Sequence, residues 1–325
     1  MEKFYLVLSP ENNPEFNLAM EEFLLKNTDK YFVFLWQNQP SVIIGNNQNA
    51  YLEVNFNKAI ENNVKIVRRL TGGGAVYHDL NNVNYSIISP YEKNDDNLYI
   101  KFTLPVIKYL KSLGVNAEFS GRNDITVNGK KISGNAQVVY KNRILHHGTL
   151  LFNTNLDALD SVLKENKLKI ESKGIKSNRA RVTNILDEMQ EKISVEKFFS
   201  QLKDFLAKDL EVYLLTKKDL ENIVKLKDEK YATFNWNIAS SPTGDMRFTH
   251  KFTFGVFSLF FSVKDGKIFN AEIFGDFFQK QDIKNFALSL NGINFTKQDL
   301  LKAFNNIDQF IVGGDAKEIT DKIFS

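Results

Sequence analysis

The spacing of apolar residues divides the chain into short strands and amphipathic helices. Apolar runs predict strands at residues 4–8, 32–36, 42–44, 64–67, 83–89 and 144–153. Helical spacing predicts helices at residues 55–62, 102–113 and 195–206. A further helix is expected to start at Asn13-Pro14, with asparagine as the cap and proline in the first turn. The pattern alone does not define a fold.

The residue composition changes near residues 237–246, where Ser-Ser-Pro-Thr-Gly-Asp interrupts the apolar pattern. We place a domain boundary there, which gives a large domain at residues 1–245 and a small one at residues 246–325. In the small domain, strands are expected at residues 252–263 and 267–274, joined by a hairpin at Asp265-Gly266. Helices are expected at residues 283–290, 297–305 and 315–324. The small domain is therefore predicted to be an α+β unit.

Composition removes several classes of chemistry. The chain of 325 residues has a net charge of +3 and contains no cysteine, which excludes disulfides, thiolate metal sites and a cysteine nucleophile. Its four histidines argue against a histidine-rich metal site. No apolar run is long enough to span a bilayer, the N-terminus does not resemble a signal peptide, and no nucleic-acid-binding motif is found. We expect a cytoplasmic enzyme or binding protein, with no membrane or nucleic-acid partner.

A glycine-rich segment at residues 68–79, Arg-Arg-Leu-Thr-Gly-Gly-Gly-Ala-Val-Tyr-His-Asp, follows one predicted strand and leads into another. Three consecutive glycines let the backbone approach a ligand closely, and free N–H groups in such a turn bind anions. Arg68 and Arg69 add donors suited to phosphate or carboxylate. The spacing fits neither a P-loop nor a dinucleotide fingerprint. The alternative is a tight loop with two solvated arginines.

A hairpin is predicted at Asn128-Gly129, which is the strongest short turn signal in the chain. A two-residue turn sets the expected pairs as Val127 with Lys130, Thr126 with Lys131, Ile125 with Ile132 and Asp124 with Ser133. Strand alternation then places Asp124 and Lys131 on one face as diagonal neighbours, and the apolar residues Ile125, Val127 and Ile132 on the other. The pair is either part of a site or an ordinary solvent-facing ion pair.

Two adjacent histidines lie in the predicted strand at residues 144–153. Because neighbouring strand residues point to opposite faces, only one of His146 and His147 can face a site, and His147 shares its face with Thr149. Either histidine can instead be a satisfied core or surface residue. The basic stretch at residues 164–181 is read either as a lid that closes over an anion or as a solvated loop.

Three segments together resemble the lipoate–protein ligase A family: the glycine-rich segment, the hairpin region at residues 121–134, and residues 146–151 followed by residues 174–184. The likeness extends over essentially the whole chain. It implies an α+β fold, with a biotin/lipoyl ligase-like catalytic domain and a small α+β accessory domain at the C-terminal end. Departures are modest: Thr71 stands where many members have serine, and an arginine that some members carry after residue 134 is absent.

The resemblance also implies a reaction. Lipoate and ATP, with Mg²⁺, would give lipoyl-AMP and pyrophosphate, and a lysine of a carrier protein would then take the lipoyl group. The implied carriers are lipoyl domains of 2-oxoacid dehydrogenase acyltransferases or the glycine cleavage H protein, and the enzyme is expected to be a monomer. By similarity Lys131 is the catalytic residue and Asp124 the magnesium ligand. The residues implied to bind nucleotide and lipoate are Arg69, Thr71, Gly72, Gly73, Gly74, Ala75, Val76, Tyr77, His78, Asn123, Asp124, Lys131 and His147.

Other functions compete with this interpretation. Octanoyl or lipoyl transferases with the same fold pass the acyl group through a cysteine thioester, and the absence of cysteine argues against them. A biotin ligase is disfavoured because its Gly-Arg-Gly-rich segment is missing. The remaining alternative is a non-catalytic protein that binds lipoyl groups or nucleic acid, which the presence of Lys131 with Asp124 disfavours.

Overall fold

The computed structural model describes residues 3–46, 48–92, 97–121, 123–164, 182–241, 244–275, 277 and 280–325. Residues 165–181 of the basic stretch, which include residues 174–181 of the third resembling segment, lie outside the described residues. The chain forms two compact units, Met1–Asn46 with Val64–Thr233, and Asn47–Asn63 with Phe234–Ser325. These units differ from the division at residue 245 expected from the sequence, and that division stays a prediction.

A mixed sheet forms the centre of the first unit. Its strand order is β11(Glu211–Val212), β1(Phe4–Leu8), β2(Tyr31–Trp36), β6(Asn82–Pro90), β10(Arg143–Leu151), β9(Lys130–Tyr140), β8(Asp124–Val127) and β7(Glu118–Ser120). Strand β1 runs parallel to β2 and β11, and the other neighbours are antiparallel. The strands predicted at residues 4–8, 32–36, 83–89 and 144–153 are all present, with ends shifted by at most two residues.

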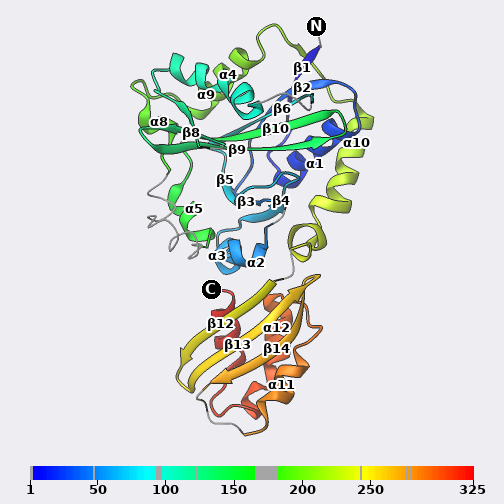
Figure 1. Ribbon diagram of the computed structural model, residues 1–325, viewed down its shortest axis with the longest axis vertical. Helices are drawn as coiled ribbons and strands as arrows, with labels where there is room; N and C mark the ends of the chain where they lie inside the picture. Colours follow the sequence, from blue (N-terminus) through cyan, green and yellow to red (C-terminus); the bar gives the residue numbers. More distant parts are fainter. Residues whose placement is uncertain are drawn as a thin grey trace. The chain divides into compact units, whose positions relative to one another are not determined.

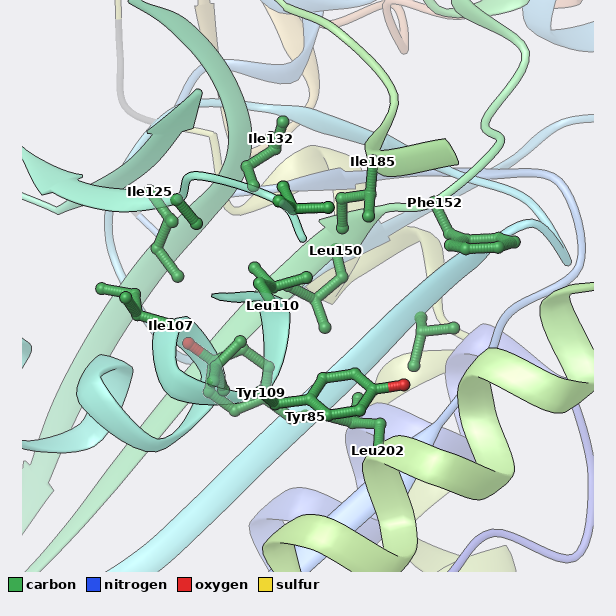
Figure 2. Packing of buried hydrophobic residues seen from close by; sticks show 14 of the residues in the cluster. Tyr85, Ile107, Tyr109, Leu110, Ile125, Ile132, Leu150, Phe152, Ile185 and Leu202 are labelled. Carbon is green, nitrogen blue, oxygen red and sulfur yellow. The ribbon is translucent and has the colours of Figure 1, made fainter. Parts of the chain in front are cut away.

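One face of this sheet carries the main apolar core. Helices α4(Leu98–Ser112) and α9(Val195–Leu206) lie on that side (Figure 1). Figure 2 shows the close packing of Tyr85 and Leu150 from the strands with Leu110 and Leu202 from these helices. Helix α9 has the bounds that its apolar stripe predicted, whereas α4 starts at Leu98, four residues before its predicted start. Short helices α5(Leu156–Val162) and α8(Ile185–Glu188) follow strand β10 in the chain.

The opposite face is covered by different elements. A small sheet of order β4(Lys65–Arg68), β3(Ser41–Ile44) and β5(Val76–His78) lies there together with α1(Pro14–Lys26) (Figure 1). The predicted cap of α1 is confirmed, because the Asn13 side chain accepts hydrogen bonds from the backbone N–H groups of Glu15 and Phe16. Helix α10(Lys217–Leu226) and the π-helical turn η1(Lys227–Tyr231) pack on α1, and the sequence did not predict them.

The second unit is an α+β unit. It contains the antiparallel sheet β12(Gly244–Phe252), β13(Gly255–Lys264) and β14(Lys267–Gly275), and the helices η2(Asn235–Ala239), α11(Ile283–Ser289), α12(Lys297–Ala303), η3(Phe304–Gln309) and α13(Ala316–Ile323). The hairpin at Asp265-Gly266 is confirmed. The strand predicted at residues 252–263 is wrong at its start, because Phe252 ends β12 and a turn separates it from β13.

A segment far away in the sequence completes the second unit. Helices α2(Ala50–Glu53) and α3(Phe56–Glu61) belong to it. The helix predicted at residues 55–62 is present as α3, and Asn55 is its cap. The Tyr51 ring lies 4.5 Å from the ring of Phe295, and Phe56 contacts Phe324 edge-on. Aromatic packing therefore explains why residues 47–63 group with the C-terminal part of the chain. None of the helices in the described ranges is long and apolar enough to cross a membrane.

Candidate active site

A pocket of about 100 Å³ lies in the first unit, on the face of the large sheet that the main apolar core leaves uncovered. Strand β2 contributes Trp36, β6 contributes Asn84 and β10 contributes His147 and Thr149. Strand β10 also contributes Gly148. The remaining lining comes from α1, the small sheet, the glycine-rich turn, the hairpin region and strand β9, namely Leu18, Ile43, Arg69, Gly73, Gly74, Ala75, Val76, His78, Asn123, Lys131, Gly134, Asn135 and Ala136.

The floor of the pocket is a row of residues that crosses the sheet. Trp36 is paired with Asn84, and Asn84 is paired with Thr149. The backbone N–H of Gly134, on the next strand β9, donates to the Thr149 hydroxyl at 3.2 Å. Neighbouring strands are spaced by 4.7–4.9 Å, so Gly134 and Trp36 lie about 14 Å apart along this row. The pocket therefore suits an elongated ligand that lies across the strands.

A β-bulge places the charged pair at one end of this row. The Asn128-Gly129 turn has the predicted positive φ angles of 51° and 74°, and the first two predicted strand pairs are present. The next two predicted pairs are wrong. Ile125 pairs with Ser133 rather than Ile132, and Asp124 pairs with Gly134 rather than Ser133, because strand β9 contains one extra residue there.

This shift brings Lys131 and Asp124 together over a glycine. The Lys131 Nζ atom lies 2.8 Å from Asp124 Oδ1, and both side chains are about one-third exposed. A Cβ atom at Gly134 would lie 2.8 Å from Nζ and 2.9 Å from Cε of Lys131. Glycine at position 134 therefore leaves the space that the ammonium group occupies. The Lys131 backbone is fixed as well, since its carbonyl accepts from the Thr183 N–H at 3.0 Å.

The buried guanidinium of Arg69 stabilises the glycine-rich turn through hydrogen bonds to its carbonyl groups. Arg69 donates from Nη2 to the carbonyls of Gly72 at 2.7 Å and Gly74 at 2.9 Å, and from Nη1 to the carbonyl of Ile43 at 3.0 Å. Gly73 has a φ of +97°, and a Cβ there would lie 3.0 Å from Nη2 of Arg69. Glycine at this position thus allows the positive φ angle and leaves room for the Arg69 guanidinium.

The turn presents its N–H groups for a ligand. Within the described part of the chain, no hydrogen-bond acceptor is found for the backbone N–H groups of residues 72–75. Arg68 and Arg69 are 0% and 5% exposed, so the alternative of a loop with solvated arginines is wrong. Burial lowers the pKa of Arg69 to about 10, which leaves it charged at neutral pH. A positive charge behind exposed N–H groups is suited to an anion such as phosphate or carboxylate.

A buried chain of hydrogen bonds links this turn to the floor of the pocket. The Arg69 Nε–H donates to the Thr71 hydroxyl at 2.9 Å, and that hydroxyl lies 2.8 Å from His147 Nε2. The other ring nitrogen, Nδ1, lies 3.0 Å from the carboxylate of Glu21 on α1. Because the Thr71 oxygen accepts from arginine, its proton is available for Nε2. This arrangement assigns the ring proton to Nδ1, which donates to Glu21.

Glu21 is in turn fixed by the sheet. The Ser86 hydroxyl donates to Glu21 Oε1 at 2.5 Å and accepts from the Trp36 indole N–H at 2.8 Å. Glu21 is 3% exposed, and its charge is balanced by that of Arg69 at the other end of the chain of contacts. This buried network therefore sets the positions of the turn and of two lining side chains, Trp36 and His147.

With this geometry in place, comparisons with known proteins define the family. The family model described as "Lipoyl protein ligase A/B catalytic domain" matches residues 13–207. The family model described as "Bacterial lipoate protein ligase C-terminus" matches residues 241–323. The chain belongs to the lipoate–protein ligase family. Lipoate–protein ligase 1 of Staphylococcus aureus is 46% identical over 266 residues, which cover 80% of this chain and 81% of that protein.

Solved structures of the lipoate–protein ligase family have the same fold as this chain. A bipartite lipoate protein ligase of Thermoplasma acidophilum, studied with its E2 lipoyl domain, has a TM-score of 0.64 and 30% identity over 73% of this chain and 96% of that chain. A lipoate–protein ligase A bound with ATP has a TM-score of 0.63 and 30% identity over 73% of this chain and 98% of that chain. The predicted family and fold class are confirmed.

Most of the predicted site residues of this lipoate–protein ligase family member meet at the pocket. Nine of them line it, namely Arg69, Gly73, Gly74, Ala75, Val76, His78, Asn123, Lys131 and His147. Thr71 is buried behind the lining and contacts His147, and Asp124 contacts Lys131. Gly72 and Tyr77 are absent from the lining. Tyr77 alternates with Val76 and His78 in β5, so its side chain points to the opposite face of that strand. The roles of Gly72 and Tyr77 in binding stay predictions.

Sequence reasoning missed the part of the pocket formed by distant elements. Trp36, Asn84 and Glu21 lie on β2, β6 and α1, and no local motif marks them. Thr149 could have been found, because strand alternation already placed it on the face of His147. Asn84 and Ser86 are buried polar residues that alternate with Val83, Tyr85 and Ile87 in strand β6, and such buried polar positions are the available signal for the missed part.

Proposed function

We propose that this chain activates lipoate with ATP to give lipoyl-AMP and then transfers the lipoyl group to a lysine of a lipoyl domain. The observation that carries the proposal is the Lys131 ammonium, which sits over Gly134 at one end of a pocket that suits an elongated ligand. The related ATP-bound ligase and the archaeal ligase studied with its lipoyl domain support the nucleotide and the acceptor.

In the first step a lipoate carboxylate oxygen attacks the α-phosphorus of ATP, and the bond to pyrophosphate breaks. Negative charge builds up on the phosphate oxygens. The N–H groups of residues 72–75 and the Lys131 ammonium are donors already in place for that charge, and preorganised donors of this kind are a large source of catalysis. The Arg69 contacts keep the turn rigid, so its donors need not reorganise during the reaction.

In the second step the neutral ε-amine of the carrier lysine attacks the acyl carbonyl, an amide bond forms, and AMP leaves. Lys131 would donate to the carbonyl oxygen as it becomes negative. The chain has no cysteine, so the acyl group has no thioester route through this protein. The adenylate is therefore the only activated form of the acyl group in this mechanism.

Magnesium would be held mainly by phosphate oxygens. Among the described residues, no group of three or more His, Cys, Asp or Glu side chains is placed to bind a metal by itself. Asp124 offers a single carboxylate beside Lys131, and Mg²⁺ in nucleotide sites is commonly bound by one or two carboxylates together with phosphates. Asp124 therefore fits as the protein ligand, and the ion would supply charge compensation for the phosphates.

The test is pyrophosphate release from ATP that depends on added lipoate, followed by mass spectrometry of a lipoyl domain. We expect release only with lipoate, and a domain heavier by one lipoyl group. Lys131→Ala should lower the rate of both steps by about 100- to 1000-fold, equivalent to about 2.7–4 kcal/mol of transition-state stabilisation. Lys130→Ala is the matched control, because Lys130 is the exposed neighbour of Lys131 and does not line the pocket.

Two results would contradict this proposal. One is pyrophosphate release that is independent of lipoate. The other is a Lys131→Ala variant that forms the adenylate at the wild-type rate, which would remove this lysine from the catalytic assignment.

A further inference from the structure

His78 lies at the end of the pocket that is remote from Lys131. Its ring contacts the Trp36 ring edge-on with centroids 5.9 Å apart, and Trp36 and Gly134 mark opposite ends of the row across the sheet. His78 lines the pocket and is 2% exposed. A ligand whose carboxylate lies at Lys131 would therefore bring its distal end toward His78 and Trp36.

One backbone carbonyl sets the protonation pattern of the His78 ring. The carbonyl of Gln37 can only accept, so the Asn17 side chain must turn its NH2 group toward it, at 3.0 Å. The same NH2 group donates to Asn38 Oδ1 at 2.8 Å, while Asn17 Oδ1 accepts from the hydroxyl of Ser9 at 2.5 Å. Asn38 must then turn its own NH2 group toward His78 Nδ1, at 3.1 Å.

His78 Nδ1 is therefore the acceptor nitrogen, and the ring proton is on Nε2. That nitrogen is buried and has no hydrogen-bond partner among the described residues. Burial, with the positive charge of Arg69 nearby, lowers the pKa of His78 to about 3, so the ring is neutral at physiological pH. A buried donor without a partner is unfavourable, and an acceptor that enters the pocket would relieve that cost.

A second histidine shows that an unpaired nitrogen alone does not define a site. His146 also has an amide nitrogen, from Gln137, 2.9 Å from its Nδ1, and a buried Nε2 without a partner among the described residues. It lies on the opposite face of the sheet, against the rings of Tyr85 and Phe102, and does not line the pocket. His78, in contrast, lines the pocket, where a ligand can reach it.

We propose that the Nε2–H group of His78 donates to a sulfur atom of the dithiolane ring of lipoate and so selects lipoate over octanoate. This inference rests on the proposed function. Lipoate and octanoate share an eight-carbon chain and a carboxylate, and only lipoate has acceptor atoms at its distal end. Sulfur is a weak acceptor, but octanoate leaves the buried donor unpaired, and a site with an unpaired polar group rejects the ligand that lacks the partner.

The experiment compares kcat/KM for lipoate and octanoate, measured by ATP-dependent acyl transfer, in wild type and His78→Phe. Phenylalanine keeps a ring and removes the donor. We expect the ratio of lipoate to octanoate to fall by about 3- to 10-fold, the size of one weak hydrogen bond. His146→Phe is the matched control and should leave the ratio within about twofold of wild type. His78→Gln keeps an N–H donor and should retain more of the preference than His78→Phe.

Direct binding of both acids, measured by calorimetry, separates this inference from the proposed function. If wild type forms no acyl-adenylate, the proposed function fails, and the binding ratio still tests His78. A ratio that is unchanged in His78→Phe, or equally reduced in His146→Phe or His78→Gln, would overturn the inference. Thermal unfolding of each variant checks that it is folded. If His78→Phe does not fold, His78→Leu, which also lacks the donor, takes its place. An unchanged ratio in His78→Leu then overturns the inference, and a ratio reduced below that of His78→Gln supports it.

Discussion

The two faces of the large sheet use the same strands for different purposes. His146 and His147 are adjacent in β10 and point in opposite directions. His146 is packed between aromatic rings on the apolar face, and burial lowers its pKa to about 3. On the other face, both ring nitrogens of His147 are hydrogen-bonded, to Thr71 and Glu21. The apolar face supplies stability through burial, and the polar face supplies a fixed geometry for the pocket.

The difference predicts which substitutions change stability and which change activity. The apolar face is continuous with α4 and α9, so losses there should unfold the unit without altering the chemistry of the folded fraction. On the pocket face, buried hydrogen bonds connect the glycine-rich turn with His147 and Glu21, so changes there should alter rates first. The following variants test this separation, from the largest expected effect to the smallest.

Leu150→Ala should give the largest loss of stability. Leu150 is fully buried in the apolar core, and truncation of a buried leucine leaves a cavity, so the free energy of unfolding should fall by about 2–5 kcal/mol. Urea unfolding measures this change, and kcat/KM of the folded protein should stay within about twofold. Leu104→Ala, at a position 43% exposed on α4, is the control and should change little. A large change in kcat/KM would argue against separate faces.

Thr71→Val should affect both properties. Valine has the shape of threonine without the hydroxyl that joins Arg69 to His147, so two buried polar groups lose a partner. The free energy of unfolding should fall by about 1–3 kcal/mol, and lipoate activation should slow because the turn is held less firmly. Thr71→Ser keeps the hydroxyl and should remain close to wild type in both measurements. If the two variants behave alike, the hydroxyl does not connect the turn to the sheet.

Gly134→Ala should change activity with little effect on stability. The added Cβ would lie under 3 Å from Lys131 Cε and Nζ, and the flexible lysine can move away at low cost to the fold. Displacing the ammonium should lower kcat/KM by about tenfold, or about 1.4 kcal/mol. Chemical denaturation should show a free energy of unfolding within about 1 kcal/mol of wild type. Unchanged kcat/KM would show that the glycine does not position Lys131.

The buried histidines should make stability fall as the pH falls. Folding lowers the pKa of His78 and of His146 from about 6.5 to about 3, so the unfolded chain binds more protons between these values. Their contribution is fully present above pH 6.5, and each histidine should reduce the free energy of unfolding by about 1 kcal/mol between pH 6.5 and 5.5. Urea midpoints across this range should show a shallower slope in His146→Phe than in wild type. Equal slopes would mean that His146 is not held neutral by burial.

Local patterns were sufficient for much of the fold. Apolar spacing gave the bounds of α9 and most strands of the large sheet, and the Asn13-Pro14 pair marked the cap of α1. The Asn128-Gly129 turn set the register of the two strand pairs next to it. Helix α10 was missed, and strand β12 was missed because its residues follow directly on the stretch interpreted as a boundary. The bulge in β9 was also missed, since the turn sets register only near itself.

The sequence by itself determined the chemistry of one end of the pocket. The three glycines, Arg69 and Lys131 lie in short segments whose residue types and spacing already indicate an anion site. Only the tertiary structure placed Glu21 on His147, Asn38 on His78 and Trp36 at the far end of the row, because these partners come from separate elements. Hydrogen bonds between distant segments depend on how the sheets and α1 pack, and periodicity within a segment carries no information about that packing.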